Sequence, residues 1–429
     1  MASTAVAPRV LARPEHAVSR SMIDEDALKV LYRLHKAGYR AFLVGGSVRD
    51  LMLGRRPKDF DVGTSAKPPE IRRLFRNARI IGRRFRLAHI LFRDNIVEVS
   101  TFRREPDPKQ QASAPEDLLI TSDNTFGTPA EDAFRRDFTI NGLFYDISDF
   151  SVVDYVGGID DLERRLVRVI GDPDVRFQED PVRILRACEF AGRLGFTIET
   201  GTQLAIERNV ESLKKGAPPR LAEEILQLLR CGAAGASLQW MLELGVLEVV
   251  VPEASAMLRA KRVGAGDFSA VLPVIDQLVA ERRTLSDPLL LAALLLPAVL
   301  LERFAYERDQ RRSMPLTVYQ EVRAAAAAPF FERLCFANHK RTSASHIMDG
   351  FHRICTTRWT PSKQRRFAAT RIFPDALLLL EILVRATGHG RETLEGWQAL
   401  ASAPPPADSK ARPARRRRTR RGGRRRPRG

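Results

Sequence analysis

Residues 41–62, which read AFLVGGSVRDLMLGRRPKDFDV, constrain the fold of this chain more than any other stretch. A short apolar run predicts a strand that ends in Gly-Gly-Ser at 45–47, and residues 48–54 then have the apolar spacing of a helix. After a basic loop, Asp-Phe-Asp-Val predicts a second strand. Because side chains alternate along a strand, Asp59 and Asp61 would share one face while the apolar residues face the core.

This stretch combines two features that suit the handling of phosphate. Glycines let backbone N–H groups come close to an anion, and the N-terminus of a helix favours negative charge. Two carboxylates on one strand face can share hard cations such as Mg²⁺. Each feature has an ordinary alternative, because Gly-Gly after a strand is a common tight turn and an Asp-x-Asp pair is often a solvated loop. Their order and closeness in the sequence favour phosphoryl transfer.

The order of strand, Gly-Gly-Ser, helix with Arg49 and Asp50, and Asp-x-Asp resembles the active site of polymerase-β-type nucleotidyltransferases. It is most similar to the branch that contains the tRNA CCA-adding enzymes and the bacterial poly(A) polymerases. Four further similar stretches follow in the family's order: RRDFTIN, DYVGGIDDL, QEDPVRILR and RLAEEILQLLR. The resemblance covers roughly residues 22–235. The segment IIGRRFRLAHILF at 80–92 resembles the bacterial poly(A) polymerases, and the CCA-adding enzymes differ there.

The resemblance implies two groups of site residues. Asp59 and Asp61 would hold two Mg²⁺ ions, with Asp137 as a further acid near the sugar and triphosphate. The substrate ATP would be bound by residues from several of these stretches: Gly45, Gly46, Ser47, Arg49, Arg136, Asn141, Asp180, Arg183 and Arg186. Glu98 is a separate candidate, because it is the one acid in the predicted strand 95–102. It is either a third carboxylate beside the metal pair or a side chain at a solvated edge.

Asp180 and Arg183 predict which bases are accepted. They are three residues apart and would lie on neighbouring positions of one helix face. A carboxylate accepts from an exocyclic amine, and a guanidinium donates to a ring nitrogen. Adenine and cytosine both present that pair of groups, whereas guanine and uracil present the reverse. The alternative is that Asp180, followed by Pro181, simply caps the helix N-terminus.

The charge of the chain favours a polyanionic partner. The formal net charge is +18, and Lys410–Gly429 contributes one Lys and eleven Arg with no acid, or +12. Such a tail binds nucleic acid by releasing phosphate counterions, although an anionic membrane surface or a solubilising role would also suit it. A basic cluster at Lys363–Arg366 is either a contact for an RNA backbone or a solvated face.

Several features of the sequence indicate the cellular compartment. The four cysteines have no metal-binding spacing and indicate reduced thiols of a cytosolic protein. The N-terminus lacks the apolar core of a signal peptide. The apolar run Leu289–Leu301 contains Pro297 and is too short to span a bilayer. We therefore expect a cytoplasmic protein without a transmembrane segment.

Together these observations predict an α+β fold, with a polymerase-β-like nucleotidyltransferase palm followed by an all-helical C-terminal half. We expect disordered ends at 1–21 and 401–429, a catalytic domain at 22–150, a nucleotide-recognition domain at 151–235 and a helical RNA-binding region at 236–400. The predicted function is template-independent addition of AMP to RNA 3′ ends by a monomer, in support of RNA decay, with RNA-decay machinery as a further partner. The alternatives are a CCA-adding enzyme and an RNA-binding protein that has lost catalysis.

Overall fold

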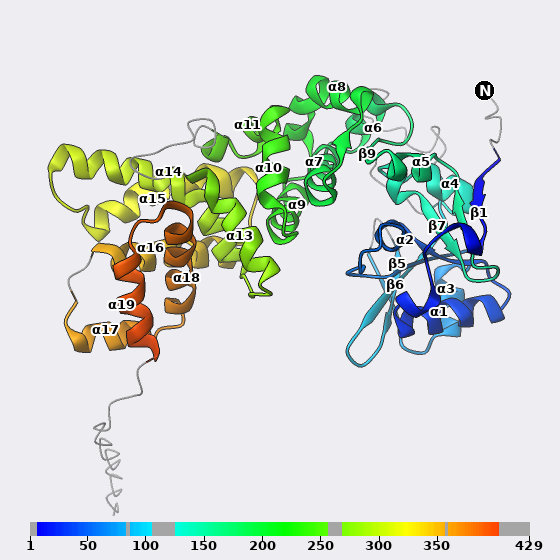
Figure 1. Ribbon diagram of the computed structural model, residues 1–429, viewed down its shortest axis with the longest axis horizontal. Helices are drawn as coiled ribbons and strands as arrows, with labels where there is room; N and C mark the ends of the chain where they lie inside the picture. The colour runs from blue at the N-terminus through cyan, green and yellow to red at the C-terminus, as the bar shows by residue number, and fades with distance from the viewer. Residues whose placement is uncertain (1–6, 83–85, 105–124, 256–267, 357–358, 403–429) are drawn as a thin grey trace, which may run out of the picture.

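An eight-stranded mixed sheet forms the N-terminal part of the computed structural model, and most of the remaining chain is helical (Figure 1). The structure describes residues 7–82, 86–104, 125–255, 268–356 and 359–402. The strands lie in the order β1-β8-β7-β2-β3-β6-β5-β4, and every neighbouring pair is antiparallel except β3 and β6. They are β1 (Arg9–Leu11), β2 (Ala41–Val44), β3 (Asp61–Thr64), β4 (Ala78–Ile81), β5 (Leu87–Leu91), β6 (Ile96–Thr101), β7 (Leu143–Asp146) and β8 (Val152–Asp154).

The two faces of the sheet are covered differently. One face packs against the main hydrophobic core, to which α1 (Glu25–Lys36), α2 (Gly46–Met52) and α3 (Pro68–Leu74) contribute. The other face carries a smaller cluster that includes the ring of Phe144 and Ala133 of α4 (Pro129–Phe134). Strand register decides which side chains reach this second face, and the site residues described below lie there.

Local sequence explains α1, because the apolar spacing from Ala27 to Leu34 predicts an amphipathic helix at 24–36 that Gly38 ends. The Asp24 carboxylate accepts hydrogen bonds from the backbone N–H groups of Asp26 (2.9 Å) and Ala27 (3.2 Å), and so caps α1. The helix buries its apolar stripe and is followed by Gly38, whose φ of +84° lies in the left-handed region that glycine tolerates. Both ends therefore agree with the sequence prediction.

The helical part extends away from the sheet as a series of packed helices, which Figure 1 shows from green to red. A small parallel pair, β9 (Leu166–Val167) with β10 (Thr197–Ile198), precedes most of it. The helices are α5 (Gly158–Glu163), α6 (Pro173–Glu179), α7 (Val182–Leu194), α8 (Thr200–Asn209), α9 (Pro218–Arg230), α10 (Ala234–Glu243), α11 (Val246–Val250), α13 (Val271–Ala280), α14 (Asp287–Gln310), α15 (Leu316–Arg333), α16 (Asn338–Thr356), α17 (Pro361–Ala368), α18 (Phe373–Thr387) and α19 (Arg391–Ser402). Short 3₁₀ turns are η1 (Arg13–Glu15), η2 (Arg20–Met22), η4 (Thr139–Asn141), η5 (Val210–Lys215) and η6 (Phe268–Ala270).

Helix α14 contains the apolar run noted in the sequence. It continues through Pro297 to a length of 24 residues, which by length and composition alone would suffice to cross a membrane. Of the most apolar 18-residue window of α14, 61% is buried in the helical core, as is usual for the central helix of a packed bundle. The apolar run was judged too short to span a bilayer from its own length, but it lies within a longer helix that tertiary packing holds through Pro297.

The α+β class with a helical C-terminal half is confirmed, whereas several details differ from expectation. Within the stretch 1–21, expected to be disordered, β1 pairs with β8 at the sheet edge and Val18 is fully buried. The sheet also includes β8, which lies beyond residue 150. Strand β4 was not predicted. Edge strand β4 has only four residues, and edge strand β1 has only three between Pro8 and Pro14, so each has too little local pattern to be recognised without its partner.

Candidate active site

Strand register brings Asp61 and Glu98 together. Asp61 begins β3 and lies opposite Val44, whose side chain belongs to the smaller cluster on the second sheet face. In the parallel pair β3–β6, Val62 lies beside Val99, so the preceding residues Asp61 and Glu98 are neighbours on that same face. The predicted alternation in β6 is therefore correct. Glu98 also lies 3.2 Å from His89 Nε2.

Asp59 differs from the prediction. It lies before β3 in an irregular, exposed segment, so it is not part of the strand with Asp61. The pairing of β3 with β2 begins only at Asp61, which lies opposite Val44. Asp59 is nevertheless close enough for its charge to contribute to the raised pKa of Asp61.

The acidic neighbours of Asp61 would favour a cation beside it. Burial, followed by the charge of Glu98, raises the pKa of Asp61 to about 6; Arg136 opposes this rise and Asp59 adds to it. A positive ion between these carboxylates would relieve their repulsion. Among the residues that the structure describes, no group of three or more His, Cys, Asp or Glu is arranged as a metal site. The set still suits Mg²⁺, which is commonly held by one or two carboxylates together with water and substrate phosphates.

The Gly-Gly-Ser turn is fixed by close approaches. Gly45 has a φ of +74°, and a Cβ atom there would come within 2.8 Å of Arg136 Nη1. Its N–H donates to the carbonyl of Leu143 (3.1 Å). The Ser47 hydroxyl donates to the carbonyl of Val44 (3.0 Å) and is buried. Gly45 is therefore required by geometry, while the Ser47 hydroxyl serves the turn in this conformation.

Arg49 is a buried structural link rather than an exposed phosphate contact. Only 2% of it is exposed, and its guanidinium donates to Asp50 (2.8 Å) and to the side-chain oxygen of Asn141. It lies 5.1 Å from the ring centroid of Phe190 on α7. Burial lowers the pKa of Arg49, and Asp50 opposes that shift. Arg49 thus ties α2 to η4 and to α7.

The stretch RRDFTIN places its charged side chains beside the glycine turn. Arg136 donates to Asp132 (3.0 Å) and to the carbonyl of Asn141 (3.3 Å), and it lies 5.2 Å from the ring of Phe144. Because Phe144 belongs to the smaller cluster, Arg136 lies on the same sheet face as Asp61. The predicted site residues Gly45, Asp61 and Arg136 are therefore neighbours.

Asp137 is held by partners on three sides. It accepts from the Phe138 N–H (2.8 Å), from Asn141 Nδ2 (3.0 Å) and from Arg186 Nε (2.8 Å). Burial opposes its ionisation, but the charge of Arg186 and these hydrogen bonds outweigh burial and lower the pKa of Asp137 to about 2. Arg186 also reaches Glu224 (3.6 Å). Asp137 is thus a permanently ionised anchor for Arg186.

Asp180 and Arg183 are placed differently from either sequence interpretation. Asp180 lies between α6 and α7, and Pro181 occupies the N-cap position of α7 without a side-chain cap bond. The capping alternative is therefore wrong. The Asp180 carboxylate accepts from both terminal nitrogens of Arg220, at 2.8 Å each. Arg183 donates to the carbonyl of Arg176 (2.9 Å) and to Glu179 (3.3 Å), so the two side chains have separate partners.

Sequence reasoning missed three residues of this region. Arg220 and Glu224 are four apart on α9, and they hold Asp180 and Arg186 respectively. Arg176 is buried and donates to the carbonyls of Arg135 (2.7 Å) and Arg136 (2.8 Å). The available signal was an Arg and a Glu four residues apart on an amphipathic helix, but their partners were far away in sequence.

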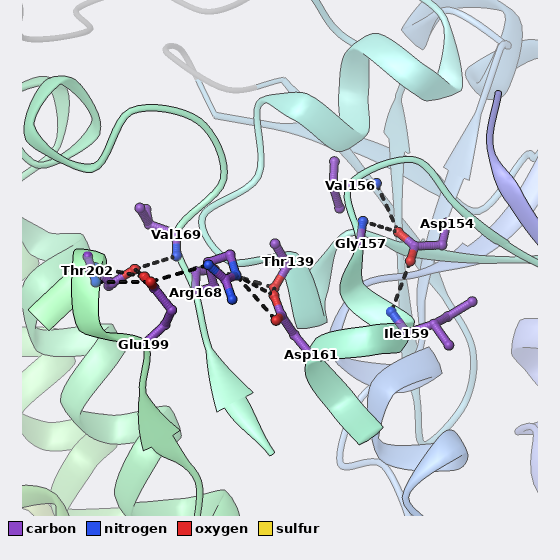
Figure 2. A network of polar contacts seen from close by, with 11 residues as sticks. Thr139, Asp154, Val156, Gly157, Ile159, Asp161, Arg168, Val169, Glu199 and Thr202 are labelled. Atoms are coloured by element: carbon purple, nitrogen blue, oxygen red, sulfur yellow. Dashed lines mark hydrogen bonds and ion pairs between the residues drawn. The ribbon is translucent and has the colours of Figure 1, made fainter. Parts of the chain in front are cut away.

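The DYVGGIDDL stretch forms a second polar network (Figure 2). The Asp154 carboxylate accepts from the N–H groups of Val156 (2.9 Å), Gly157 (3.0 Å) and Ile159 (2.9 Å). Next to it, Asp161 accepts from Thr139 Oγ1 (2.7 Å).

From there the network continues into the helical part. Asp161 accepts from Arg168 Nε (3.0 Å), and Arg168 also contacts Glu199 (3.3 Å) at the start of α8. A Cβ atom on Gly158 would approach the Thr139 carbonyl to 2.2 Å, so the turn is tightly packed.

Comparison with known proteins gives the relationships of this chain. Residues 41–168 match the family described as poly A polymerase head domain, and residues 195–258 match the one described as probable RNA and SrmB-binding site of polymerase A. A poly(A) polymerase I of Salmonella typhi is 48% identical over 247 residues, which cover 57% of this chain and 53% of the relative. A CCA-adding enzyme of Lactobacillus johnsonii is 37% identical over 224 residues, which cover 52% and 54%. The chain spans about half the length of the curated relatives it matches.

Solved structures share the fold. The Bacillus stearothermophilus CCA-adding enzyme in complex with CTP superposes with a TM-score of 0.64 at 22% identity, covering 88% of this chain and 81% of that chain. At this identity the likeness concerns the fold alone.

Proposed function

We propose that the protein is a template-independent poly(A) polymerase that transfers AMP from ATP to RNA 3′ ends, a proposal supported by the match of residues 41–168 to the family described as poly A polymerase head domain. The observation that carries nucleotidyl transfer is the alignment of Asp61 with Glu98 on the sheet face that also bears Arg136 beside the glycine turn. Adenylation rather than CCA addition is supported by the higher identity to poly(A) polymerase I.

In the proposed reaction the RNA 3′-hydroxyl attacks the α-phosphorus of ATP. The new P–O bond joins AMP to the RNA, the bond to the β-phosphate oxygen breaks, and pyrophosphate leaves. Asp59 and Asp61 would hold two Mg²⁺ ions, which when bound lower the pKa of the attacking hydroxyl and neutralise charge on the leaving group. Positioning and electrostatics account for most catalysis in reactions of this kind.

The chain's own residues would orient the nucleotide. Arg136 lies between the glycine turn and Asp61, where a triphosphate bound at that turn would meet its charge. Asp137 fixes the Arg186 guanidinium, although the Arg186 side chain is still 36% exposed. Arg186 can therefore offer its remaining donors to the sugar or phosphates without losing its position.

Base choice would rest on Asp180 and Arg183. The two hydrogen bonds from Arg220 use one lone pair on each oxygen of Asp180. A carboxylate has further lone pairs, which can accept from an exocyclic amine. Arg183 would donate to the adjacent ring nitrogen after leaving the Arg176 carbonyl. This arrangement admits adenine and cytosine and refuses guanine and uracil.

The domain division at about 22–150, 151–235 and 236–400 is part of the proposal, with the last region binding RNA. The proposal also includes a cytoplasmic location, a monomeric state and a role in RNA decay with decay proteins as partners. The four cysteines, all within the described residues, are unpaired, which agrees with a reducing compartment.

The deciding experiment offers each nucleoside triphosphate separately to the purified chain. One acceptor is a tRNA that lacks its CCA end, and the other is an unstructured RNA. The proposal predicts long A-tails on both RNAs and no extension with GTP or UTP. Addition limited to C, C and A on the tRNA would identify a CCA-adding enzyme instead, which the fold likeness keeps as the second candidate. RNA binding without any transfer would identify an inactive homologue.

A further inference from the structure

Helix α17 carries a basic surface outside both stretches that match known families. Lys363, Arg365 and Arg366 on the helix are exposed, and so is Arg371 in the turn that follows. None of the four forms an ion pair with an acid in the part of the chain that the structure describes. The sequence explains this, because no Asp or Glu occurs between Asp349 and Asp375.

Cations elsewhere in the helical part behave differently. Arg333 of α15 binds Glu253 through a bidentate contact, and Arg385 of α18 binds both Glu281 (2.7 Å) and Glu381 (2.6 Å). Their charges are neutralised within the protein. The charges of α17 face solvent without such neutralisation, so they are available to an outside polyanion.

The apolar side of α17 is already buried. The Phe367 ring stacks on Trp359 at a centroid distance of 5.2 Å, and it meets Phe373 and Trp397 edge-on at 5.6 and 5.9 Å. This aromatic cluster holds the helix rigidly against α18 and α19. A helix that lies on a membrane needs an exposed apolar face to enter the bilayer, and α17 has none to offer. The surface therefore suits nucleic acid better than lipid.

We propose that the basic surface of α17, formed by Lys363, Arg365, Arg366 and Arg371, binds the phosphate backbone of RNA upstream of its 3′ end. The inference rests on the proposed function for the identity of the polyanion. Figure 1 places α17 at the end of the helical part that is remote from the sheet. RNA that reaches α17 is therefore a segment distant from the 3′-terminal nucleotide, and short RNAs cannot use this surface.

The test is RNA binding measured without ATP, by fluorescence anisotropy over a range of salt concentrations. The full chain is compared with a K363Q/R365Q/R366Q variant, on a long unstructured RNA and on a short oligonucleotide. Loss of three phosphate contacts should reduce the slope of log K against log salt by about 2 and weaken long-RNA affinity roughly tenfold or more. Affinity for the short oligonucleotide should not change.

A matched control removes the same charge elsewhere. Arg72, Arg73 and Arg76 are exposed residues in and just after α3, and R72Q/R73Q/R76Q also lowers the net charge by three. Equal weakening in the control and in the α17 variant would show a net-charge effect and overturn the proposal. An unchanged affinity of the α17 variant would overturn it too. A third result would also overturn the proposal. If the α17 variant alone lost binding to phosphatidylserine vesicles while its RNA affinity was retained, the surface would be a membrane contact.

AMP transfer at saturating RNA is measured separately. If the wild-type chain transfers no AMP but its long-RNA affinity depends on α17, the proposed function fails and the RNA surface stands. If transfer is normal and affinity is independent of α17, the surface fails and the proposed function stands.

Discussion

The charges around the sheet and those on α17 are used in opposite ways. Near the sheet, Arg49, Arg176 and Arg186 are removed from water to differing degrees, and each is satisfied by carboxylates or carbonyls. Buried charges must be paired, and the pairing fixes their positions. On α17 the cations have no acidic partner within the described residues and keep their hydration. The first arrangement suits a reaction that needs fixed geometry, and the second suits an RNA of any sequence.

The strongest test of the region near the sheet removes the negative charge of Asp61, which a bound cation would need. Asp61→Asn keeps the volume of the side chain but cannot hold a metal ion as a carboxylate does. We expect AMP transfer to fall by at least about a thousandfold, because metal-assisted neutralisation contributes several kcal/mol. The control is Asp94→Asn, an exposed acid in the β5–β6 turn, which should keep full activity. Normal transfer by the Asp61 variant would remove the catalytic assignment.

Breaking an anchor in the same region should cost stability. Arg186→Gln leaves Asp137 buried without its ionic partner, and we expect a loss of about 2 kcal/mol in the free energy of unfolding at pH 7. Arg208→Gln removes an exposed, solvent-screened pair with Asp174 and should cost much less. Urea denaturation of both variants compares them directly, and equal losses would contradict the distinction between the two pairs.

The pH dependence of stability gives an independent check on Asp137. Its pKa in the folded protein is about 2, below the ordinary value of 3.8, so the folded state binds fewer protons than the unfolded state. The resulting stabilisation is complete above about pH 4 and is lost as pH falls towards 2. The Arg186→Gln variant should lack much of this acid-side slope, which thermal melts between pH 2 and 5 would detect.

Weakening the contact between Arg220 and Asp180 should alter nucleotide selectivity more than the stability of the fold. A lysine cannot bind a carboxylate through two parallel donors, so Arg220→Lys should let Asp180 move. We expect the ratio of ATP to GTP incorporation to fall roughly tenfold, the effect of about one net hydrogen bond. Arg230→Lys on the same helix, whose partners are Glu223 and Asp287, should leave the ratio unchanged. An unaltered ratio in the Arg220 variant would reduce its role to packing.

The smallest expected effect concerns protons competing with Mg²⁺. Because the pKa of Asp61 is raised to about 6, its carboxyl binds a proton increasingly as pH falls from 7 to 5. The Mg²⁺ concentration for half-maximal transfer should rise several-fold across that window. Glu98→Gln removes the neighbouring charge and should move this dependence to lower pH. A Mg²⁺ requirement that did not vary with pH would contradict the assignment of Asp61 as a ligand.

Local pattern predicted the elements that carry the candidate site residues. The strand–glycine–helix unit is encoded by contiguous residues, and the two faces of β6 follow from alternation around Glu98. Helix α1 followed from its cap and apolar stripe. Such features need only neighbours in sequence, which is why the fold class and most of the candidate site residues could be proposed in advance.

The features that were not predicted depend on partners far along the chain. Arg220 meets Asp180 from 40 positions away, and Arg176 meets the carbonyl of Arg135 across 41 positions. Neither contact leaves a local trace in composition or period. Asp59 was assigned to a strand because the alternation was extended back from Asp61, whereas the pairing of β3 with β2 begins only at Asp61.

The contacts of Asp137 also limit how this protein can be recombined. Asp137 belongs to the stretch before the helical part, but Arg186 and then Glu224 continue its polar chain into α7 and α9. A chimera that joined residues 1–170 to the helices of a relative would take Asp137 from one parent and its partner at position 186 from the other. Exchange of base specificity between such proteins should therefore succeed only when the transferred segment extends through Arg230, the end of α9.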